Sequence, residues 1–198
     1  RYGLTQAVIE GRNTMTRRLV PWSLTEQWIE FVSDAPSVGG VYVHESEKDF
    51  YERETPRYKV GEIVAVAQNY FSTYDESKWE NGIWYNEFAD GSDITNHAGW
   101  LNKMLVKAEY MPHQIRITGI HCERLQDISD AECLKEGVRV EFARNGSPMY
   151  YYFDTKRWRE VWFDTPREAF AALIDKVSGR GTWKSNPWVV VYEFELVK

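Results

Sequence analysis

One stretch near the N-terminus, residues 10–19, fixes a point where a helix must give way to a strand. Gly11 follows a short amphipathic segment over 4–9 and suits the position just past a helix end. From Thr14 to Val20, hydroxyl, apolar and cationic side chains alternate at strand period, and the pattern stops before Pro21. The stretch also gathers groups that hold anions or read polar base edges: Arg12, Asn13, Thr14, Thr16, Arg17 and Arg18. The alternative interpretation is a surface strand with a solvated basic edge.

The rest of the chain mixes helical and strand patterns. Ser129 and Glu132 form a capping box at the start of a helix that ends at Gly137. Thr165 caps another helix that begins at Pro166. A further helix is expected from the Ser23–Glu26 capping box to Val32, with Leu24, Trp28, Phe31 and Val32 buried, and strands are expected over 39–44, 58–67, 114–125 and 186–196.

Two segments show no sustained period. The polar residues 45–57 are expected to form a loop. Residues 138–163 are expected to be irregular, apart from a hairpin at 144–148, where Asn145-Gly146 favours a tight turn.

Composition limits the class of protein. At 198 residues with 43% hydrophobic content, a single domain is expected, and apolar runs such as 188–192 are too short to span a membrane. Two cysteines without a Cys-x-x-Cys pair favour a reducing, cytoplasmic setting. Because the chain begins at Arg1 rather than Met, we expect a few N-terminal residues to precede it.

The net charge is −6, whereas proteins that grip long duplexes through phosphates are usually basic. The positive charge of the 10–19 stretch is therefore local. A single nucleotide, a loop or a flipped base is a better candidate ligand than extended nucleic acid.

Residues 69–112 are rich in aromatic side chains that stand among acidic ones. One interpretation is an insertion with its own small aromatic core, covering the rest of the fold. The other is a wall of the ligand site, on which bases stack. The aromatic residues concerned are Tyr70, Phe71, Tyr74, Trp79, Trp84, Tyr85, Phe88, Trp100 and Tyr110.

Gly11–Arg18 resembles the opening motif of the ASCH domain family, Gly-x-Lys-Thr-x-Thr-x-Arg. Residues 58–67, 123–137 and 186–196 are similar to further segments of the phage and mobile-element branch of that family. The resemblance implies an α+β, PUA-like fold, a small β-barrel with helices packed around a cleft. It also implies one domain over 1–198, with the insertion at about 69–112.

Members of this family are associated with RNA or modified nucleosides, and one type hydrolyses acetylated cytidine. The resemblance places the catalytic lysine of that type at Asn13, its threonine at Thr16 and its helix glutamate at Glu136. Thr16 and Glu136 are therefore the candidate catalytic residues. An asparagine has no useful basicity, so the hydrolase set is incomplete. The alternative for Glu136 is a structural one, in which it caps its helix or pairs with an arginine.

The candidate ligand-binding residues are Arg12, Asn13, Thr14, Arg17 and Arg18. Strand alternation puts Thr14, Thr16 and Arg18 on one face and Arg17 on the other, so the set cannot share one cleft. Thr16 with Arg18 is the favoured pair, and Glu136 is expected within about 10 Å of Thr16, as the resemblance implies.

No metal site or cofactor is expected. The four histidines, His44, His97, His113 and His121, are scattered, and no paired-cysteine or glycine-rich phosphate motif occurs. The leading hypothesis is an RNA-, nucleotide- or modified-nucleoside-binding module. The alternatives are an amidohydrolase acting on an acylated nucleoside and an accessory protein that binds another protein through the aromatic insertion. The sequence leaves the oligomeric state open.

Overall fold

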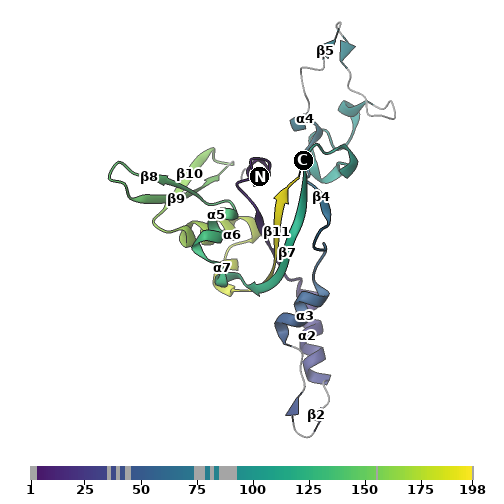
Figure 1. Cartoon of the computed structure of the whole chain (residues 1–198), viewed down its shortest axis with the longest axis vertical. Helices are drawn as coiled ribbons and strands as arrows, with labels where there is room; N and C mark the ends of the chain where they lie inside the picture. Colours follow the sequence, from purple (N-terminus) through teal and green to yellow (C-terminus); the bar gives the residue numbers. More distant parts are fainter. Residues whose placement is uncertain are drawn as a thin grey trace. The chain divides into compact units, whose positions relative to one another are not determined.

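The computed structural model describes residues 4–34, 37–38, 41–42, 46–73, 79–80, 83–84, 93–154 and 156–197 (Figure 1). The fold is mixed α+β, with a curled antiparallel sheet, a second sheet and helices. The chain divides into two compact units, one formed by Arg1–Glu62 with Ile117–Glu195 and the other by Ile63–Arg116 with Leu196–Lys198. Within the described part of the chain, no helix combines the length and the apolar character that a bilayer crossing requires.

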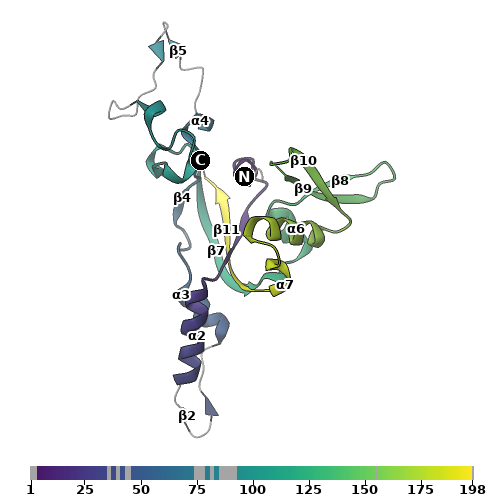
Figure 2. The same cartoon turned by 180° about the vertical axis from the view of Figure 1, so that it is seen from behind.

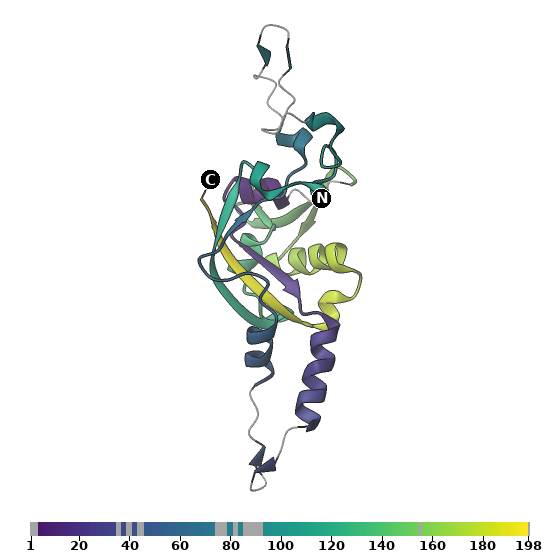
Figure 3. The ribbon, with the colours of Figure 1, turned by 90° about the vertical axis from the view of Figure 1, so that its right-hand side faces the viewer.

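The first unit is built on long antiparallel strands. β1 (Met15–Leu19) pairs with β11 (Trp188–Leu196), with Arg17 opposite Val191. β11 lies next to β7 (Gln114–Arg124), whose first three residues belong to the second unit. β1 is the end strand of the order β1-β11-β7-β4, and Figure 3 shows it beside the curved β11. One edge of β1 is therefore left for groups outside the sheet.

Three helices pack on one face of these strands and carry the main core. They are α5 (Asp130–Lys135), α6 (Pro166–Ser178) and α7 (Thr182–Ser185), and α1 (Leu4–Ile9) precedes β1. Two of the caps expected from the sequence are present: Ser129 and Glu132 form a capping box at the start of α5, and the Thr165 side chain accepts from Glu168 N–H at the start of α6. The core they close contains Met15, Leu125, Ile128, Cys133, Val138, Ala169, Phe170, Ile174, Val189 and Val191.

The segment 138–163 is a second, three-stranded sheet, so the expectation of irregular structure was wrong. β9 (Pro148–Asp154) lies between β8 (Arg139–Phe142) and β10 (Arg159–Phe163), all antiparallel. The hairpin expected around Asn145-Gly146 joins β8 to β9, and Gly146 has φ 82° there. α6 packs against β9 and β10 and lies between this sheet and the curved strands (Figure 2). The sequence of β9 is a continuous aromatic run, because both faces of the strand carry rings, so it shows no alternation.

The loop expected over 45–57 contains a helix, α3 (Glu47–Glu54), which Ser46 caps through Asp49 N–H. Its surface is charged, but it buries Phe50 and Tyr51, and two adjacent rings are too few to reveal a helical period. α3 packs against α2 (Trp22–Asp34), where the Trp28 ring lies 5.4 Å from that of Phe50.

The α2 helix differs from expectation in two ways. It begins at Trp22, with Leu24 N–H donating to the Pro21 carbonyl, so the expected cap residue Ser23 lies inside the helix. The expected stripe is only half-buried, and Phe31 is 40% exposed. The helix covers little beyond α3. Of the strand expected over 39–44, the described part is Val41–Tyr42 (β3), paired with Ser37–Val38 (β2).

The second unit begins with β4 (Ile63–Ala65), paired with the first residues of β7. The chain turns before this strand at Gly61, which has φ 87°. The strand is shorter than the predicted 58–67 and is not a core strand, since Ile63 is 53% exposed. The other elements of the second unit are α4 (Tyr70–Thr73), β5 (Trp79–Glu80), β6 (Ile83–Trp84) and the 3-10 helices η2 (Ile94–Asn96), η3 (Lys103–Leu105) and η4 (Ala108–Tyr110).

A small cluster holds this second unit together. Tyr70 and Met111 are buried, and Ala65, Trp100, Val106 and Tyr110 pack against them. The Tyr70 hydroxyl also accepts the N–H of Lys107 at 2.8 Å. These contacts favour the interpretation of the aromatic residues as a local core. The side chains of Trp79, Trp84 and Phe88 lie outside the described residues.

Candidate functional site

The candidate motif places Arg17 at the open edge of β1. Backbone hydrogen bonds join Thr14 to Phe194 and Val20 to Trp188, so the alternation along β1 turns the N–H of Arg17 away from β11. The carboxylate of Glu136 accepts that N–H. Glu136 is the C-cap residue of α5, and the carbonyl of the preceding Lys135 accepts the N–H of Thr14. The end of α5 therefore satisfies the free edge of the motif strand.

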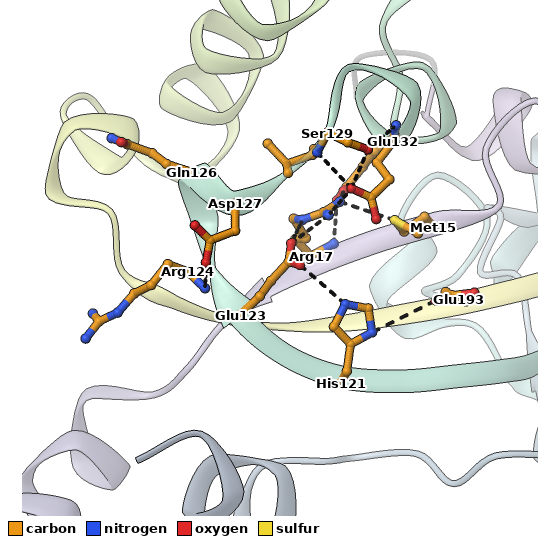
Figure 4. A network of polar contacts seen from close by, with 12 residues as sticks. Met15, Arg17, His121, Glu123, Arg124, Gln126, Asp127, Ser129, Glu132 and Glu193 are labelled. Carbon is orange, nitrogen blue, oxygen red and sulfur yellow. Dashed lines mark hydrogen bonds and ion pairs between the residues drawn. The ribbon is translucent and has the colours of Figure 1, made fainter. Parts of the chain in front are cut away.

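The Arg17 side chain is fully buried among carboxylates (Figure 4). Its Nη1 lies 2.7 Å from Glu136 Oε2, and its Nε donates to Glu123 Oε1 at 2.8 Å. Nη2 lies 3.5 Å from Oε2 of Glu132, on the first turn of α5. The Met15 sulfur completes the surroundings at 3.3 Å from Nη1. The guanidinium thus links β1, β7 and α5.

Three carboxylates share this one guanidinium. The pKa values of two of them, Glu136 and Glu132, are shifted in opposite directions. Burial raises the pKa of Glu136, and the opposing effect of Arg17 does not overcome it. Burial also acts on Glu132, but hydrogen bonds from Ser129 lower its pKa below the ordinary value. Burial alone would lower the pKa of Arg17, whereas the charges of Glu136 and Glu123 raise it. The arginine therefore stays charged, and Glu136 is less acidic than Glu132.

The network reaches the surface through His121. Its Nε2 lies 3.4 Å from Glu123 Oε2, and its Nδ1 lies 3.9 Å from Oε1 of Glu193 on β11. The His121 side chain is one-third exposed. The cluster is therefore buried at Arg17 and wet at its rim.

The other predicted ligand residues lie outside this cluster. The Arg12 guanidinium pairs with Glu10, with Nε 2.7 Å from Oε2, and both side chains are exposed. Thr14 and Thr16 are half-buried and Arg18 is exposed. Because Arg17 faces the carboxylates, strand alternation turns the Thr16 side chain to the other face of β1. Glu136 accepts the backbone N–H of Arg17, next to Thr16 in the chain. Its carboxylate nevertheless lies on the Arg17 face of β1, opposite to the Thr16 side chain.

Asn13 is the unusual member of the motif. It is only 5% exposed, and its N–H donates to the Ala7 carbonyl at 3.0 Å. Its side-chain oxygen is buried and accepts no hydrogen bond from any group that the structure describes. Buried polar atoms nearly always have a partner, so this acceptor is an unusual feature of the motif.

The arrangement supports binding better than proton transfer. Both Glu136 oxygens are engaged by Arg17, which confirms the alternative in which this carboxylate pairs with an arginine. Glu123 and Glu132 were not singled out from the sequence. The alternation along β7 could have indicated Glu123, whereas Glu132 was read only as a cap. Among the described residues, no group of three or more His, Cys, Asp or Glu is arranged to hold a metal ion.

Comparison of the chain with family models, with curated proteins and with solved structures finds no match in any of the three. The candidate site therefore rests on its own geometry.

Proposed function

We propose that this chain is a nucleoside-, nucleotide- or RNA-binding module of the ASCH type, which recognises a base through the Arg12–Arg18 segment. The observation that carries the proposal is the buried Asn13 side-chain oxygen, which has no partner among the described groups. Leaving such an acceptor unpaired costs about 1–3 kcal/mol. A ligand that donates an N–H to it recovers this free energy, and the amino and ring N–H groups of nucleobases are donors of this kind.

The residues that follow Asn13 alternate between the two faces of β1, and those on the face opposite Arg17 offer further polar groups. The half-buried hydroxyls of Thr14 and Thr16 offer hydrogen bonds to a base edge or a sugar. The exposed Arg18 lies on the same face of β1 and suits a phosphate. The Arg17 guanidinium is engaged by protein carboxylates, so we assign it a structural role that holds β1 against α5.

The curled sheet with packed helices is compatible with the PUA-like barrel that we propose as the fold type. Cys122 and Cys133 are both free and buried, which supports the proposed reducing, cytoplasmic setting.

Hydrolysis is the less favoured function for two reasons. Asn13 replaces the lysine that the hydrolase motif uses, and its amide cannot accept a proton from a threonine hydroxyl. Glu136, the remaining candidate base, accepts hydrogen bonds from Arg17 at both of its oxygens. We therefore expect bound acylated nucleosides to leave unchanged.

The experiment is a calorimetric titration with cytidine, acetylated cytidine and cytidine monophosphate. Asn13→Leu removes the amide while keeping the number and branching of the side-chain heavy atoms, so binding should weaken about fivefold to a hundredfold. The same change replaces an unpaired buried polar group by an apolar one, so the free energy of unfolding should be unchanged or higher. Loss of binding together with retained stability identifies a ligand contact. The control is Asn102→Leu, which removes an amide from the second unit.

Two results would overturn the proposal. One is saturable binding that Asn13→Leu leaves intact, and the other is no binding of any of the three probes. The hydrolase alternative is tested by Asn13→Lys, which restores the missing base: acetate release that Thr16→Ala then abolishes would support that alternative.

A further inference from the structure

One face of the β8–β9–β10 sheet is an aromatic surface outside the Arg12–Arg18 segment. The register places Trp162 and Arg139 on either side of Tyr151, and Phe153 lies two residues further along β9. The opposite face carries Tyr150 and Phe163, which pack against the main core. The other face bears Tyr151, Phe153 and Trp162, of which Tyr151 is buried at 5% exposure and Phe153 is half-buried. Trp162 is 39% exposed, and its ring lies 4.4 Å from that of Tyr151.

The turn between β9 and β10 extends this surface with a tryptophan and three cations. Trp158 is 80% exposed, and its ring stands edge-on to that of Phe153 at 5.5 Å. Its backbone has φ 51°, a left-handed conformation that bulky side chains rarely adopt. Strain of this kind persists only where the surroundings impose it, and it concentrates at functional sites. The neighbouring cations Lys156, Arg157 and Arg159 are all exposed.

A buried aspartate holds this turn in shape. Asp154 is fully buried at the end of β9 and accepts the N–H of Lys156 at 3.1 Å. Its other oxygen is ion-paired with Lys176 of α6. The hydrogen bond from Lys176 lowers the pKa of Asp154, so this carboxylate stays ionised at neutral pH. The turn that displays Trp158 is thus anchored to the helical layer.

The local charge is opposite in sign to that of the whole chain. Residues 139–163 contain five Lys and Arg against three Asp and Glu, a net charge of +2 in a chain of net charge −6. One of the three acids is Asp154, which is neutralised by Lys176. Anions that approach this acidic protein are therefore favoured at this sheet.

We propose that this face, with the half-buried Phe153 and the exposed Trp158 and Trp162, binds a short stretch of single-stranded nucleic acid. Bases stack on the exposed indoles of Trp158 and Trp162, while Lys156, Arg157 and Arg159 neutralise phosphates. Aromatic platforms flanked by cations bind single strands with little sequence preference, because every base has a face that can stack. A duplex hides those faces inside its own stack and cannot use the rings. The inference goes beyond the proposed function and uses none of its residues.

The test is fluorescence anisotropy of the full chain with labelled eight-nucleotide RNA and DNA strands, compared with the matching duplexes. Both single strands should bind, and a preference between them identifies the natural sugar. Trp158→Gly suits the left-handed backbone and should weaken binding by at least about fivefold, the loss expected for one base stack. Trp158→Phe keeps a ring and should retain part of the affinity. The control is Trp22→Ala, since Trp22 on α2 is also exposed, at 71%.

Salt dependence tests the cations separately. Changing Lys156, Arg157 and Arg159 to Gln should reduce the slope of log affinity against log salt by about 2, as expected for three lost phosphate contacts. Changing the exposed Lys48, Arg53 and Lys184 to Gln removes the same charge elsewhere and should leave most of the slope. The proposal is overturned if neither single strand binds at low salt, or if Trp158→Gly and Trp22→Ala behave alike. It is also overturned if duplexes or polyglutamate compete as well as single strands do.

Discussion

Glu136 binds Arg17 twice, accepting the backbone N–H with one carboxylate oxygen and lying 2.7 Å from the guanidinium with the other. The two residues are separated by 119 positions in the chain. This contact attaches the end of α5 to the free edge of β1. It also occupies both oxygens of the carboxylate that a hydrolase would need as a base. The same pair thus stabilises the motif strand and limits its chemistry.

The first prediction concerns the imbalance of charge at this pair. Arg17→Met leaves Glu123, Glu132 and Glu136 facing one another without a cation, so the free energy of unfolding should fall by about 3–5 kcal/mol. Glu136→Gln keeps an acceptor for the Arg17 N–H and should cost only about 1–3 kcal/mol. Urea denaturation measures both.

The matched control for this prediction is Arg53→Met. Arg53 pairs with Glu54 at the surface, with both side chains more than 40% exposed, so its loss should cost less than about 1 kcal/mol. Equal losses for Arg17→Met and Arg53→Met would contradict the structural role of the buried arginine.

The second prediction is a pH dependence that comes from Glu136. Burial raises its pKa above 4.5 in the folded state, so folding favours its protonated form. Its contribution to stability is therefore fully present below pH 4.5 and is lost as the pH rises through the folded pKa. The free energy of unfolding of the wild type minus that of Glu136→Gln should fall with pH across this window. A difference that stays flat or rises would show that the burial of Glu136 does not dominate.

The third prediction concerns the two thiols. Burial raises the pKa of Cys122 and of Cys133 to about 12, and both are fully buried. Thiolate is the reactive form, so neither cysteine should react with a disulfide reagent in the native protein, and both should react in denaturant. Rapid labelling of one thiol under native conditions, resolved by mass spectrometry, would contradict its burial.

The fourth prediction tests the core of the second unit. A Cβ added at Gly99 would overlap the ring of Tyr70, which is only 1% exposed. Gly99→Ala should therefore lower amide-exchange protection over 63–116 while leaving the strands of the first unit protected. Gly146→Ala is the contrasting variant, because a Cβ there meets no neighbour within 4 Å and only the φ of 82° opposes it. Unchanged protection over 63–116 in Gly99→Ala would contradict the packing of Tyr70.

Local signals predicted many elements of the fold well. The helices starting at Ser129 and Thr165 were found because caps are local and each is satisfied within three or four residues. β1 and β7 were found from their alternation, whereas β11 was expected as the closing strand that the family resemblance implies. Helix α3 was missed because Phe50 and Tyr51 are adjacent and all their neighbours are charged or polar.

The candidate site was harder to predict because its contacts are not local. Alternation alone separated Arg17 from the threonines, but nothing near Arg17 indicates that Glu123 and Glu132 enclose it. The β8–β10 sheet was missed because rings on both faces of β9 hide the period of two that identifies a half-buried strand. The sequence shows Trp158 among three cations, but it does not show that the side chain is exposed on a turn next to Phe153.

The central claim is that the Asn13 site binds a nucleoside and leaves it unchanged, and the fate of acetylated cytidine tests it most directly. The wild-type protein is titrated with acetylated cytidine in a calorimeter, and the nucleoside is then recovered and separated by chromatography. We predict a saturable heat that Asn13→Leu removes, with all of the nucleoside recovered in its acetylated form. Cytidine and acetate in the recovered material, formed by the wild type and not by Thr16→Ala, would contradict the account, as would a titration without saturable heat.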